Sequence, residues 1–506
     1  SRDRMGVRPL YYSTTGQTFS FGSEVKSLLH HPRTPRGLDV QALRQTFTYW
    51  HPLPPRTPFI GICELPPAHS MVVTEAGTTV SRYWEPHYRD TAGGRREEDY
   101  AEELVALMRD ATRIRLRADV PVGAYLSGGL DSTIVMSLAR SLTSAPFKTF
   151  SISFDDPEFD ESTYQRTAVA HFHTEHRDVR CSYADIGKAF EQVVWHAERT
   201  VLRTAPAPLF LLSALVRQHG YKVVLTGEGS DELFGGYDLF KEAKIRAFWA
   251  RVPHSRWRPL LLKRLYPYLP QVQLQSSEYL ASFFAVRPGD IGSPFFSHLP
   301  RWQMTAGLQR LLSEDLRVTL RDANYDELEA QLPQAFASWD LFSKASYLET
   351  TGLLPGYILS SQGDRVAMAH GVEGRFPFLD HRVVEFAMGL PSTLKMRTLR
   401  EKYLLKRAFL PSIPAEIAGR FKQPYRAPDA RSLFGTPQAP LRHDYVEELL
   451  TPAKIQEFGM FSATAVSGLV RKAKRGELTS VRDNMGLVGV LSTQLLIERF
   501  LGRFTG

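Results

Sequence analysis

Residues 120–133 read VPVGAYLSGGLDST, and this stretch decides the fold. A short apolar run, long enough for a buried strand, ends in Ser127-Gly128-Gly129, and apolar residues then recur at helical spacing from Ile134 to Leu142. The pattern predicts a strand, a glycine turn and a helix. Two glycines let the backbone approach a ligand closely, and the N–H groups at a helix start favour an anion. Phosphate is the natural anion for such a loop.

The loop differs from a Walker-type phosphate loop because it has no lysine. It offers Asp131 instead, and a carboxylate at an anion site is unfavourable unless a divalent cation separates it from the phosphates. We therefore expect a cradle for pyrophosphate and Mg²⁺. Such a site suits adenylation, in which the α-phosphate of ATP is attacked and the other two phosphates leave together.

A glycine turn in an ordinary αβ unit would explain Gly128 and Gly129. It would not explain Ser127, Asp131 and Ser132 together. The motif Ser-Gly-Gly-x-Asp-Ser resembles the pyrophosphate loop of the N-type ATP pyrophosphatases, a group that includes asparagine, GMP and argininosuccinate synthetases.

A second motif follows another apolar strand, where residues 226–237 read TGEGSDELFGGY. Its carboxylates, Glu228, Asp231 and Glu232, repel one another unless a cation or a cationic substrate group is near. A solvated acidic turn is the alternative, but the segment has the same position after a strand as the first loop. We expect Asp131 and Asp231 to hold Mg²⁺ jointly against the pyrophosphate.

Strands alternate with helices from residue 120 to residue 226, which predicts an α/β fold with a doubly wound parallel sheet. Ligands of such sheets bind beyond the carboxyl ends of the strands. The two motifs, in this order, resemble the synthetase domain of glutamine-dependent asparagine synthetases. The resemblance implies a sheet of the ATP pyrophosphatase type with added helices.

The resemblance also implies roles for individual residues. Lys402 matches a family lysine that faces the α-phosphate, Glu228 would lie where ammonia meets the activated carboxylate, and Glu373 belongs to a stretch that lines the acceptor pocket. An exposed helix lysine and a structural ion pair between Glu373 and Arg375 are the alternatives. Glu232 and Arg375 are candidates for binding the acceptor acid. ATP would be bordered by Leu126, Ser127, Gly128, Gly129, Asp131, Ser132, Ser153 and Gly227.

Residues 1–85 resemble the later part of the family's glutaminase domain, 86–98 are expected to form a linker, and 99–506 the synthetase domain. The family's glutaminase nucleophile is an N-terminal cysteine, and this chain contains none. Cys63 and Cys181 match no nucleophile motif. The chain begins at Ser1 without a methionine, so we expect either a fragment of a glutamine-dependent enzyme or one that uses free ammonia.

The composition of this 506-residue chain limits the classes of partner that we expect. Its net charge of +8 is spread out, and the longest basic cluster, residues 471–475, is short, so no nucleic-acid partner is expected. Two cysteines rule out a disulfide framework and fit a reducing, cytoplasmic location. No apolar run long enough to span a bilayer is evident, so no membrane partner is expected.

A homodimer is possible. Residues 422–428 form a proline-containing loop that could cover a pocket.

The expected function is ATP-dependent amide formation with ATP and Mg²⁺. By the family default aspartate becomes asparagine through an acyl-adenylate, with ammonia drawn from glutamine. One rival is an amide ligase of a natural-product pathway that acts on another acid, or intramolecularly as in β-lactam synthetases and lasso-peptide cyclases. Another is a non-catalytic binding or assembly subunit that keeps the fold, against which the intact Asp131, Asp231 and Lys402 argue.

Overall fold

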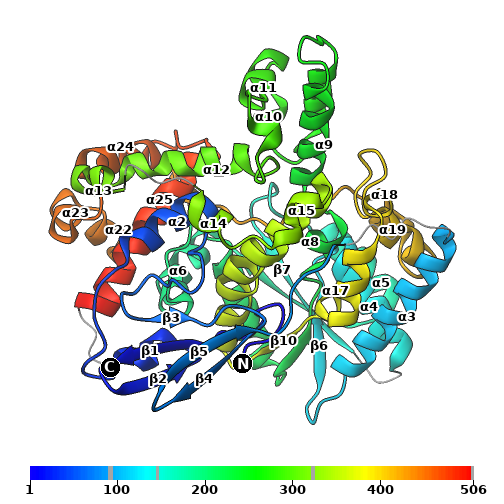
Figure 1. Cartoon of the computed structure of the whole chain (residues 1–506), viewed down its shortest axis with the longest axis horizontal. Helices are drawn as coiled ribbons and strands as arrows, with labels where there is room; N and C mark the ends of the chain where they lie inside the picture. The colour runs from blue at the N-terminus through cyan, green and yellow to red at the C-terminus, as the bar shows by residue number, and fades with distance from the viewer. Residues whose placement is uncertain (89–94, 144–146, 321–324, 503–506) are drawn as a thin grey trace.

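A central parallel sheet organises the molecule (Figure 1). The computed structural model describes residues 1–88, 95–143, 147–320 and 325–502. The sheet has five strands in the order β10-β9-β6-β7-β8, all parallel. This confirms the predicted doubly wound α/β fold. The strands are β6 (Val122–Tyr125), β7 (Lys148–Phe154), β8 (Glu175–Cys181), β9 (Val223–Leu225) and β10 (Glu373–Arg375).

Helices cover both faces of the sheet, which explains why its central strands β6 and β9 are mostly apolar. On β9, Val224 and Leu225 are both fully buried, yet they belong to two different hydrophobic cores. One core contains side chains of α3 (Glu97–Arg115), α4 (Leu130–Leu142) and α5 (Ser162–Phe172), and the other contains side chains of α6 (Tyr183–Ala197) and α7 (Pro206–Gln218).

The direction in which strands are added reverses between β6 and β9. In open α/β sheets this switch point is where ligands bind, because neighbouring loops diverge there. The loop after β6 leads into α4, and the loop after β9 leads into α8 (Ser230–Phe234). A Cβ atom on Gly227 would lie 2.9 Å from the Cβ of Asp131, so glycine lets the two loops touch.

The first 82 residues form small antiparallel sheets. One hairpin pairs β1 with β2, and a second hairpin joins β4 to β5. The elements here are β1 (Tyr11–Thr15), β2 (Thr18–Gly22), α1 (Val25–Leu29), α2 (Val40–Tyr49), β3 (Cys63–Glu64), β4 (His69–Thr74) and β5 (Gly77–Arg82).

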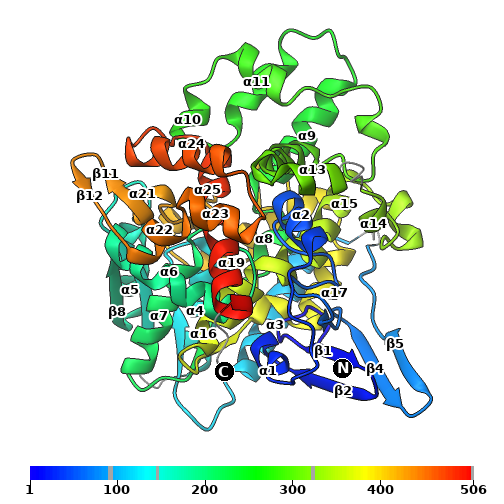
Figure 2. The ribbon, with the colours of Figure 1, turned by 90° about the vertical axis from the view of Figure 1, so that its left-hand side faces the viewer.

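Residues 238–291, which we call the upper lobe, rise above the body of the molecule (Figures 1 and 2). Its elements are α9 (Asp238–Ala250), a 3₁₀ helix (Arg258–Arg264), α10 (Pro270–Gln273) and α11 (Ser277–Phe283). The chain then returns through α12 (Leu299–Ala306), α13 (Glu314–Thr319), α14 (Asp326–Glu329), α15 (Leu341–Leu348), π-helical turns at Glu349–Ile358 and Ser360–Asp364, and α16 (Arg365–Met368).

After β10 the chain is mostly helical. Its elements are α17 (His381–Gly389), α18 (Ser392–Lys395), α19 (Tyr403–Phe409), α20 (Ala415–Gly419), α21 (Ala430–Phe434), β11 (Gly435–Thr436), β12 (Ala439–Pro440), α22 (Asp444–Leu449), α23 (Pro452–Phe458), α24 (Ala463–Lys474) and α25 (Val481–Leu496). Pro452 starts α23 and so separates it from α22.

Two expectations from the sequence need comment. The linker expected at 86–98 lies partly at residues 89–94, outside the described residues, and α3 begins within it at Glu97.

The helix Val481–Gly502 is long and apolar enough to cross a membrane, contrary to the expectation that no such run exists. However, 72% of its most apolar window is buried inside the protein, as in a core helix.

A buried ion network ties the first 82 residues to the sheet domain. Glu64 on β3 lies 2.7 Å from the guanidinium of Arg2 and 3.4 Å from that of Arg199, which follows α6. Arg199 also donates a hydrogen bond to the Tyr11 hydroxyl at 2.9 Å. Both arginines are almost fully buried, so the Glu64 charge balances cations that water does not reach.

We predict that Glu64→Gln lowers the free energy of unfolding by about 3–5 kcal/mol, because it leaves two buried arginines without a counter-charge. The matched control is Glu175→Gln, whose side chain is 48% exposed and should cost less than about 1 kcal/mol. Urea unfolding measures both. Equal losses would show that the Glu64 network is no more important than a surface ion pair.

Candidate functional site

The loop after β6 is shaped by backbone contacts that require glycine. The Leu126 N–H donates to the Phe150 carbonyl at 2.9 Å, which continues the sheet to the start of the loop. Gly128 has a φ of +75°, and a Cβ there would lie 2.7 Å from the backbone nitrogen of Gln165. The hydroxyls of Ser127 and Ser132 lie 3.0 Å apart across the turn. The loop therefore leaves Asp131 at the first turn of α4.

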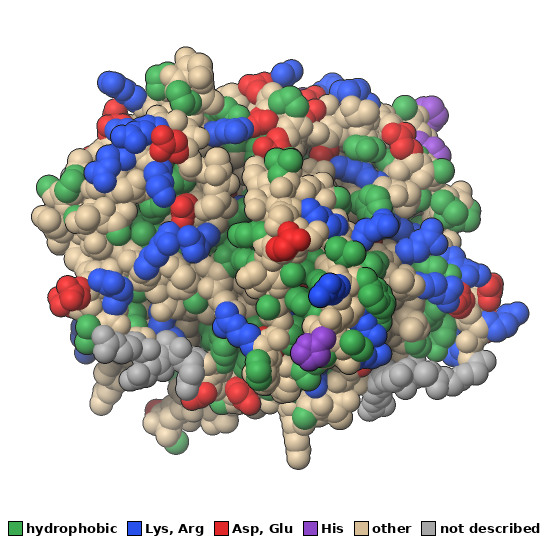
Figure 3. All heavy atoms as spheres, turned by 90° about the horizontal axis from the view of Figure 1, so that it is seen from above, with side chains coloured by type: hydrophobic (Ala, Val, Ile, Leu, Met, Phe, Trp, Pro, Cys, Tyr) green, Lys and Arg blue, Asp and Glu red, His purple; other side chains and the backbone are tan. Residues whose placement is uncertain are grey.

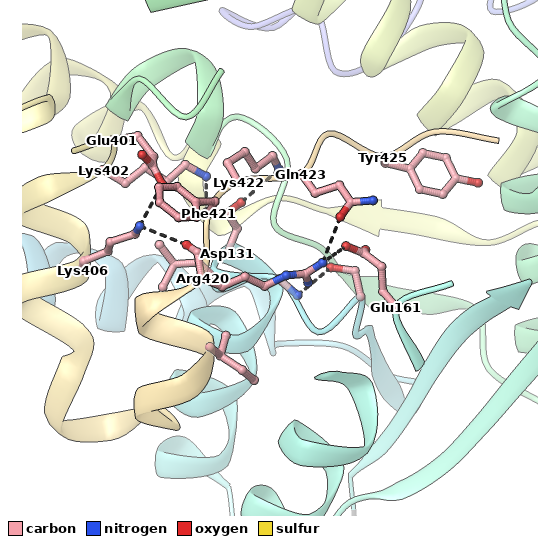
Figure 4. A pocket seen from close by; sticks show the side chains of 14 residues that line it. Asp131, Glu161, Glu401, Lys402, Lys406, Arg420, Phe421, Lys422, Gln423 and Tyr425 are labelled. Atoms are coloured by element: carbon pink, nitrogen blue, oxygen red, sulfur yellow. Dashed lines mark hydrogen bonds and ion pairs between the residues drawn. The ribbon is translucent and has the colours of Figure 1, made fainter. Parts of the chain in front are cut away.

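Asp131 and Asp231 lie close together at the switch point, and two lysines lie between them. Figure 4 shows Asp131 with both lysines. Lys402 Nζ lies 2.6 Å from Asp131 Oδ1 and 2.7 Å from Asp231 Oδ1. Lys422 Nζ lies 2.6 Å from Asp231 Oδ2 and 3.6 Å from Asp131 Oδ2. We call these four side chains the charge cluster. Its formal charges cancel.

Burial and charge act in opposite directions on the charge cluster. Burial raises the pKa of Asp131, but Lys402 and Lys422 outweigh it and hold this pKa below its usual value. Burial lowers the pKa of Lys422, but Asp231 and Asp131 raise it above its ordinary value. At neutral pH Asp131 is therefore an anion and Lys422 a cation, although both lie inside the protein.

The backbone brings Lys402 into the charge cluster by an unusual conformation. Lys402 is only 2% exposed, so it is no helix-surface lysine. It caps the start of α19 with a φ of +51°, a left-handed conformation that non-glycine residues seldom adopt. The preceding carboxylate, Glu401, is held 3.0 Å from Lys241 and 2.9 Å from Lys406. These ion pairs fix the turn that points Lys402 inward.

Lys422 belongs to residues 420–428, which have neither helix nor strand and which we call the strap. Arg420 forms an ion pair with Glu161 and stacks 3.9 Å from the ring centre of Tyr164. Further along, the Tyr425 hydroxyl donates to the Ala205 carbonyl at 3.2 Å. The strap is therefore attached on both sides of Lys422, across the mouth of the phosphate loop.

The strap and the phosphate loop enclose a cavity whose wall combines charged side chains with apolar surface (Figure 4). Sequence reasoning anticipated the strap as a cover for a pocket, but it missed Lys422 as a cation and Glu161 and Arg420 as its support. The cavity is lined by Ser127, Gly129, Leu130, Asp131, Glu161, Glu401, Lys402, Lys406, Ile417, Arg420, Phe421, Lys422, Gln423 and Tyr425.

Two further carboxylates of the second motif adjoin the charge cluster. Glu228 accepts a hydrogen bond from the Thr226 hydroxyl, and burial raises its pKa above the ordinary value. Glu232 is 1% exposed and accepts a hydrogen bond from the Tyr237 hydroxyl at 2.7 Å. Burial, together with the neighbouring Asp231 charge, raises the pKa of Glu232 to about 8. Glu232 is therefore largely protonated at neutral pH.

The structure does not bring Glu373 and Arg375 to the charge cluster. Glu373 pairs with Val223 at the amino end of β9, and Arg375 pairs with Leu225 at its carboxyl end, but neither side chain contacts the four residues of the charge cluster. Arg375 lies 2.8 Å from Glu373 and donates to the carbonyls of Arg115 and Arg117. This contact is the structural ion pair considered as the alternative. The catalytic role expected for Glu373 and the acceptor role expected for Arg375 stay predictions.

Other predicted residues have local structural partners. Ser153 donates to Asp178 at 2.8 Å and does not line the cavity. Burial raises the pKa of the Cys63 thiol, and raises that of Cys181 to about 12. Both thiols are thus poor nucleophiles at neutral pH. Within the described part of the chain, no group of three or more His, Cys, Asp or Glu side chains is arranged to hold a metal ion.

Known proteins show the same two-part organisation. The sequence profile of the asparagine synthase family matches residues 103–498, and that of a glutamine amidotransferase domain matches residues 1–84. Amidase chyE of Penicillium rubens is 29% identical, with 96% of this chain and 74% of that protein aligned. Asparagine synthetase 3 (glutamine-hydrolysing) of Bacillus subtilis is 28% identical, with 84% of this chain and 64% of that protein aligned.

Two other comparisons cover different shares of this chain. Amidase chry2 of Gibberella zeae is 27% identical over 91% of this chain and 71% of its own length. The solved structure of an NMN synthetase from Francisella tularensis covers 53% of this chain and 97% of its own, at 14% identity and a TM-score of 0.21. That score is too low to support a conclusion.

The raised pKa of Glu232 predicts a pH dependence of stability. A carboxyl whose folded pKa lies above its unfolded value binds its proton more tightly in the folded state, so stability falls as pH rises from about 4.5 to about 8. Glu232→Gln removes that decline. We expect the variant to match the parent protein at pH 5 and to be more stable by about 1 kcal/mol or more at pH 9.

Urea unfolding at pH 5, 7 and 9 measures this difference. Glu102→Gln, at an exposed position on α3, is the control and should follow the parent protein at every pH. If the free energy of unfolding changes with pH in the same way for Glu232→Gln and the parent protein, Glu232 is not protonated at neutral pH.

Proposed function

The chain belongs to the asparagine synthase family, and on that premise we propose that it uses ATP to activate a carboxylic acid and converts it to an amide. The observation that carries this proposal is the charge cluster at the switch point of the sheet. Two carboxylates and two ammonium groups are held there within hydrogen-bond distance, beside a glycine loop at a helix start. Family membership establishes a ligase-type enzyme, whereas the acid and the individual residue roles are proposals.

In this proposal the phosphate loop binds the pyrophosphate part of ATP. The N–H groups at the start of α4 and the hydroxyls of Ser127 and Ser132 supply donors. Gly128 and Gly129 let the backbone come close, and Gly227 leaves room beside Asp131. With ATP bound, Lys402 and Lys422 would contact phosphate oxygens as well as the two aspartates, so that they would stabilise the negative charge of the phosphates.

The charge cluster also fits Mg²⁺. Asp131 and Asp231 converge so closely that one ammonium nitrogen contacts both, which is the spacing that a shared cation requires. Magnesium in nucleotide sites is bound by one or two carboxylates, with phosphate oxygens and water as the other ligands. When bound, Mg²⁺ would neutralise pyrophosphate charge. A third protein ligand is therefore not needed.

The proposed reaction has two steps. The substrate carboxylate oxygen attacks the α-phosphorus of ATP, and the bond to the β-phosphate breaks to release pyrophosphate. Ammonia then attacks the carbonyl carbon of the acyl-adenylate, the bond to AMP breaks, and one proton is lost from nitrogen. Lys402 and Lys422 are placed to stabilise charge on the phosphorus oxygens in the first step. Glu228, with its raised pKa, is the proposed proton acceptor in the second.

The source of ammonia follows from the family only as a proposal. A glutamine amidotransferase match over residues 1–84 supports glutamine as the ammonia donor. Neither Cys63 nor Cys181 supports glutamine hydrolysis by the residues described, because their thiols stay protonated. Free ammonia should therefore serve this chain directly.

Aspartate is the acid that the family name suggests, and another acid is the second candidate. The fungal relatives named amidases align over larger shares of both chains than the asparagine synthetase of Bacillus subtilis does. This observation favours an amide-forming enzyme with a different carboxylate. Glu232 remains a proposed acceptor contact; it is protonated at neutral pH, so it could donate to a substrate oxygen.

We predict that Lys402→Met and Lys422→Met each lower the rate of adenylate formation by about 10²–10³-fold, because each removes a cation from the developing phosphate charge. ATP affinity should change much less. ATP–pyrophosphate exchange measures the first quantity and equilibrium ATP titration the second. Lys188→Met, at an exposed lysine on α6, is the matched control and should change neither. Equal losses of binding and rate would leave the lysines a role in binding only.

The acid can be identified by ATP–pyrophosphate exchange with a panel of carboxylic acids, Mg²⁺ and ammonia. We expect exchange that depends on one acid class and disappears in Asp131→Ala and Asp231→Ala. Exchange with aspartate supports the family default, and exchange with another acid supports the second candidate. Absence of pyrophosphate release with every acid would overturn the enzymatic proposal in favour of a binding or assembly role.

A further inference from the structure

The upper lobe carries an unusual combination of exposed apolar and unpaired basic side chains. Leu274 is 85% exposed and Trp257 59%, far above what a folded core element shows. Other large apolar side chains exposed on the lobe are Val252, Leu260, Tyr279, Phe283 and Ile291. Isolated exposed apolar residues need no explanation, but this concentration on one protruding element does.

The lobe is also strongly basic. No aspartate or glutamate occurs between residues 243 and 277, whereas this segment contains Lys244, Arg246, Arg251, Arg256, Arg258, Lys263 and Arg264. Arg251, Arg256 and Arg264 are exposed, as is Arg287 further along the lobe. None of these four forms an ion pair with any residue that the structure describes. Apolar and basic side chains lie side by side across the upper face of the molecule (Figure 3).

The lobe is nevertheless well built. Ile245, Leu262, Leu265, Leu280 and Phe284 form a small core of their own. Arg246 is buried and donates to the Phe296 carbonyl at 2.7 Å, which fixes the lobe to the body. The exposed apolar residues therefore do not result from a loose segment. They are held outward by a packed scaffold.

We propose that the upper lobe is a docking surface for an anionic lipid membrane. Arginines around exposed Trp, Tyr, Phe and Leu side chains are the pattern of elements that lie in a membrane interface. The apolar side chains would enter the headgroup region, and the four unpaired arginines would contact lipid phosphates. The proposal goes beyond the proposed function and does not depend on it, and it revises the expectation that no membrane partner exists.

Two other occupants fit the observations less well. A second copy of this chain would bring the unpaired arginines of both lobes together, and like charges repel. An acidic protein would satisfy the charge, but the exposed apolar residues belong to a protruding lobe (Figures 1 and 2), and none of them lines the cavity under the strap. A fluid lipid surface needs no complementary shape.

Vesicle co-sedimentation of the full chain tests the proposal. We compare vesicles of phosphatidylcholine alone with vesicles of phosphatidylcholine and phosphatidylglycerol in equal parts. The chain should sediment with the anionic vesicles, remain in solution with the neutral ones, and be released by high salt, because screened charges attract less. Each positive charge near such a surface contributes about fivefold in affinity.

Two variants separate the charge from the apolar contribution. The first combines Arg251→Glu, Arg256→Glu, Arg264→Glu and Arg287→Glu and should bind at least about a hundredfold more weakly. The second combines Leu260→Ser, Leu274→Ser and Ile291→Ser and should lose about tenfold. The matched control is Lys188→Glu with Arg217→Glu, at exposed positions on α6 and α7, which should bind like the parent chain.

All the changed side chains are exposed, so we expect every variant to fold like the parent chain. Thermal unfolding checks this. Failure of the parent chain to bind anionic vesicles overturns the proposal. The proposal is also overturned if the charge variant binds anionic vesicles as tightly as the parent chain, or if the control loses as much affinity as the charge variant. If soluble polyglutamate displaces the chain from vesicles at equal charge concentration, the surface is assigned to an acidic protein instead.

Discussion

The architecture depends on one electrostatic constraint: two carboxylates from different strand ends must lie side by side inside the protein. Asp131 and Asp231 approach because Gly227 leaves no side chain between their loops. Alone they would repel, and burial would make their charges costly. Lys402 and Lys422 remove that cost by lying between them. The glycines, the left-handed turn at residue 402 and the attachment of the strap all support this arrangement.

Sequence reasoning succeeded where chemistry and topology were encoded locally. The strand, glycine turn and helix around Asp131 follow from hydrophobic periodicity, and so does the meeting of Asp131 with Asp231 at one sheet edge. Lys402 was found by resemblance, but its conformation was not, because a left-handed lysine has no sequence signature. Lys422 was missed as a cation, since the strap has no periodic pattern that would reveal which side chain points inward.

The placing of Glu373 shows a different limit. A strand has two ends, and only the carboxyl end borders the site in a parallel sheet. In the three-residue strand β10, Glu373 and Arg375 occupy the same face and are close enough to pair with each other. The sequence shows two charged residues beside an apolar segment, which fits either a substrate site or a structural pair. The contacts of Arg375 with Glu373 and with the carbonyls of Arg115 and Arg117 favour the structural pair. These contacts exist only in the folded protein.

The aspartates and lysines of the charge cluster lie far apart along the sequence, and this affects the chain while it is being synthesised. Lys402 follows Asp131 by 271 residues, and Lys422 lies later still. During synthesis on the ribosome, both switch-point loops leave the exit tunnel well before either ammonium group exists. The nascent sheet must therefore keep its carboxylates hydrated or protonated until the last part of the chain arrives. Synthesis and release from the tunnel of residues 402–422 is thus the step that closes this site, and a chain stopped before the strap would keep an open, acidic sheet edge.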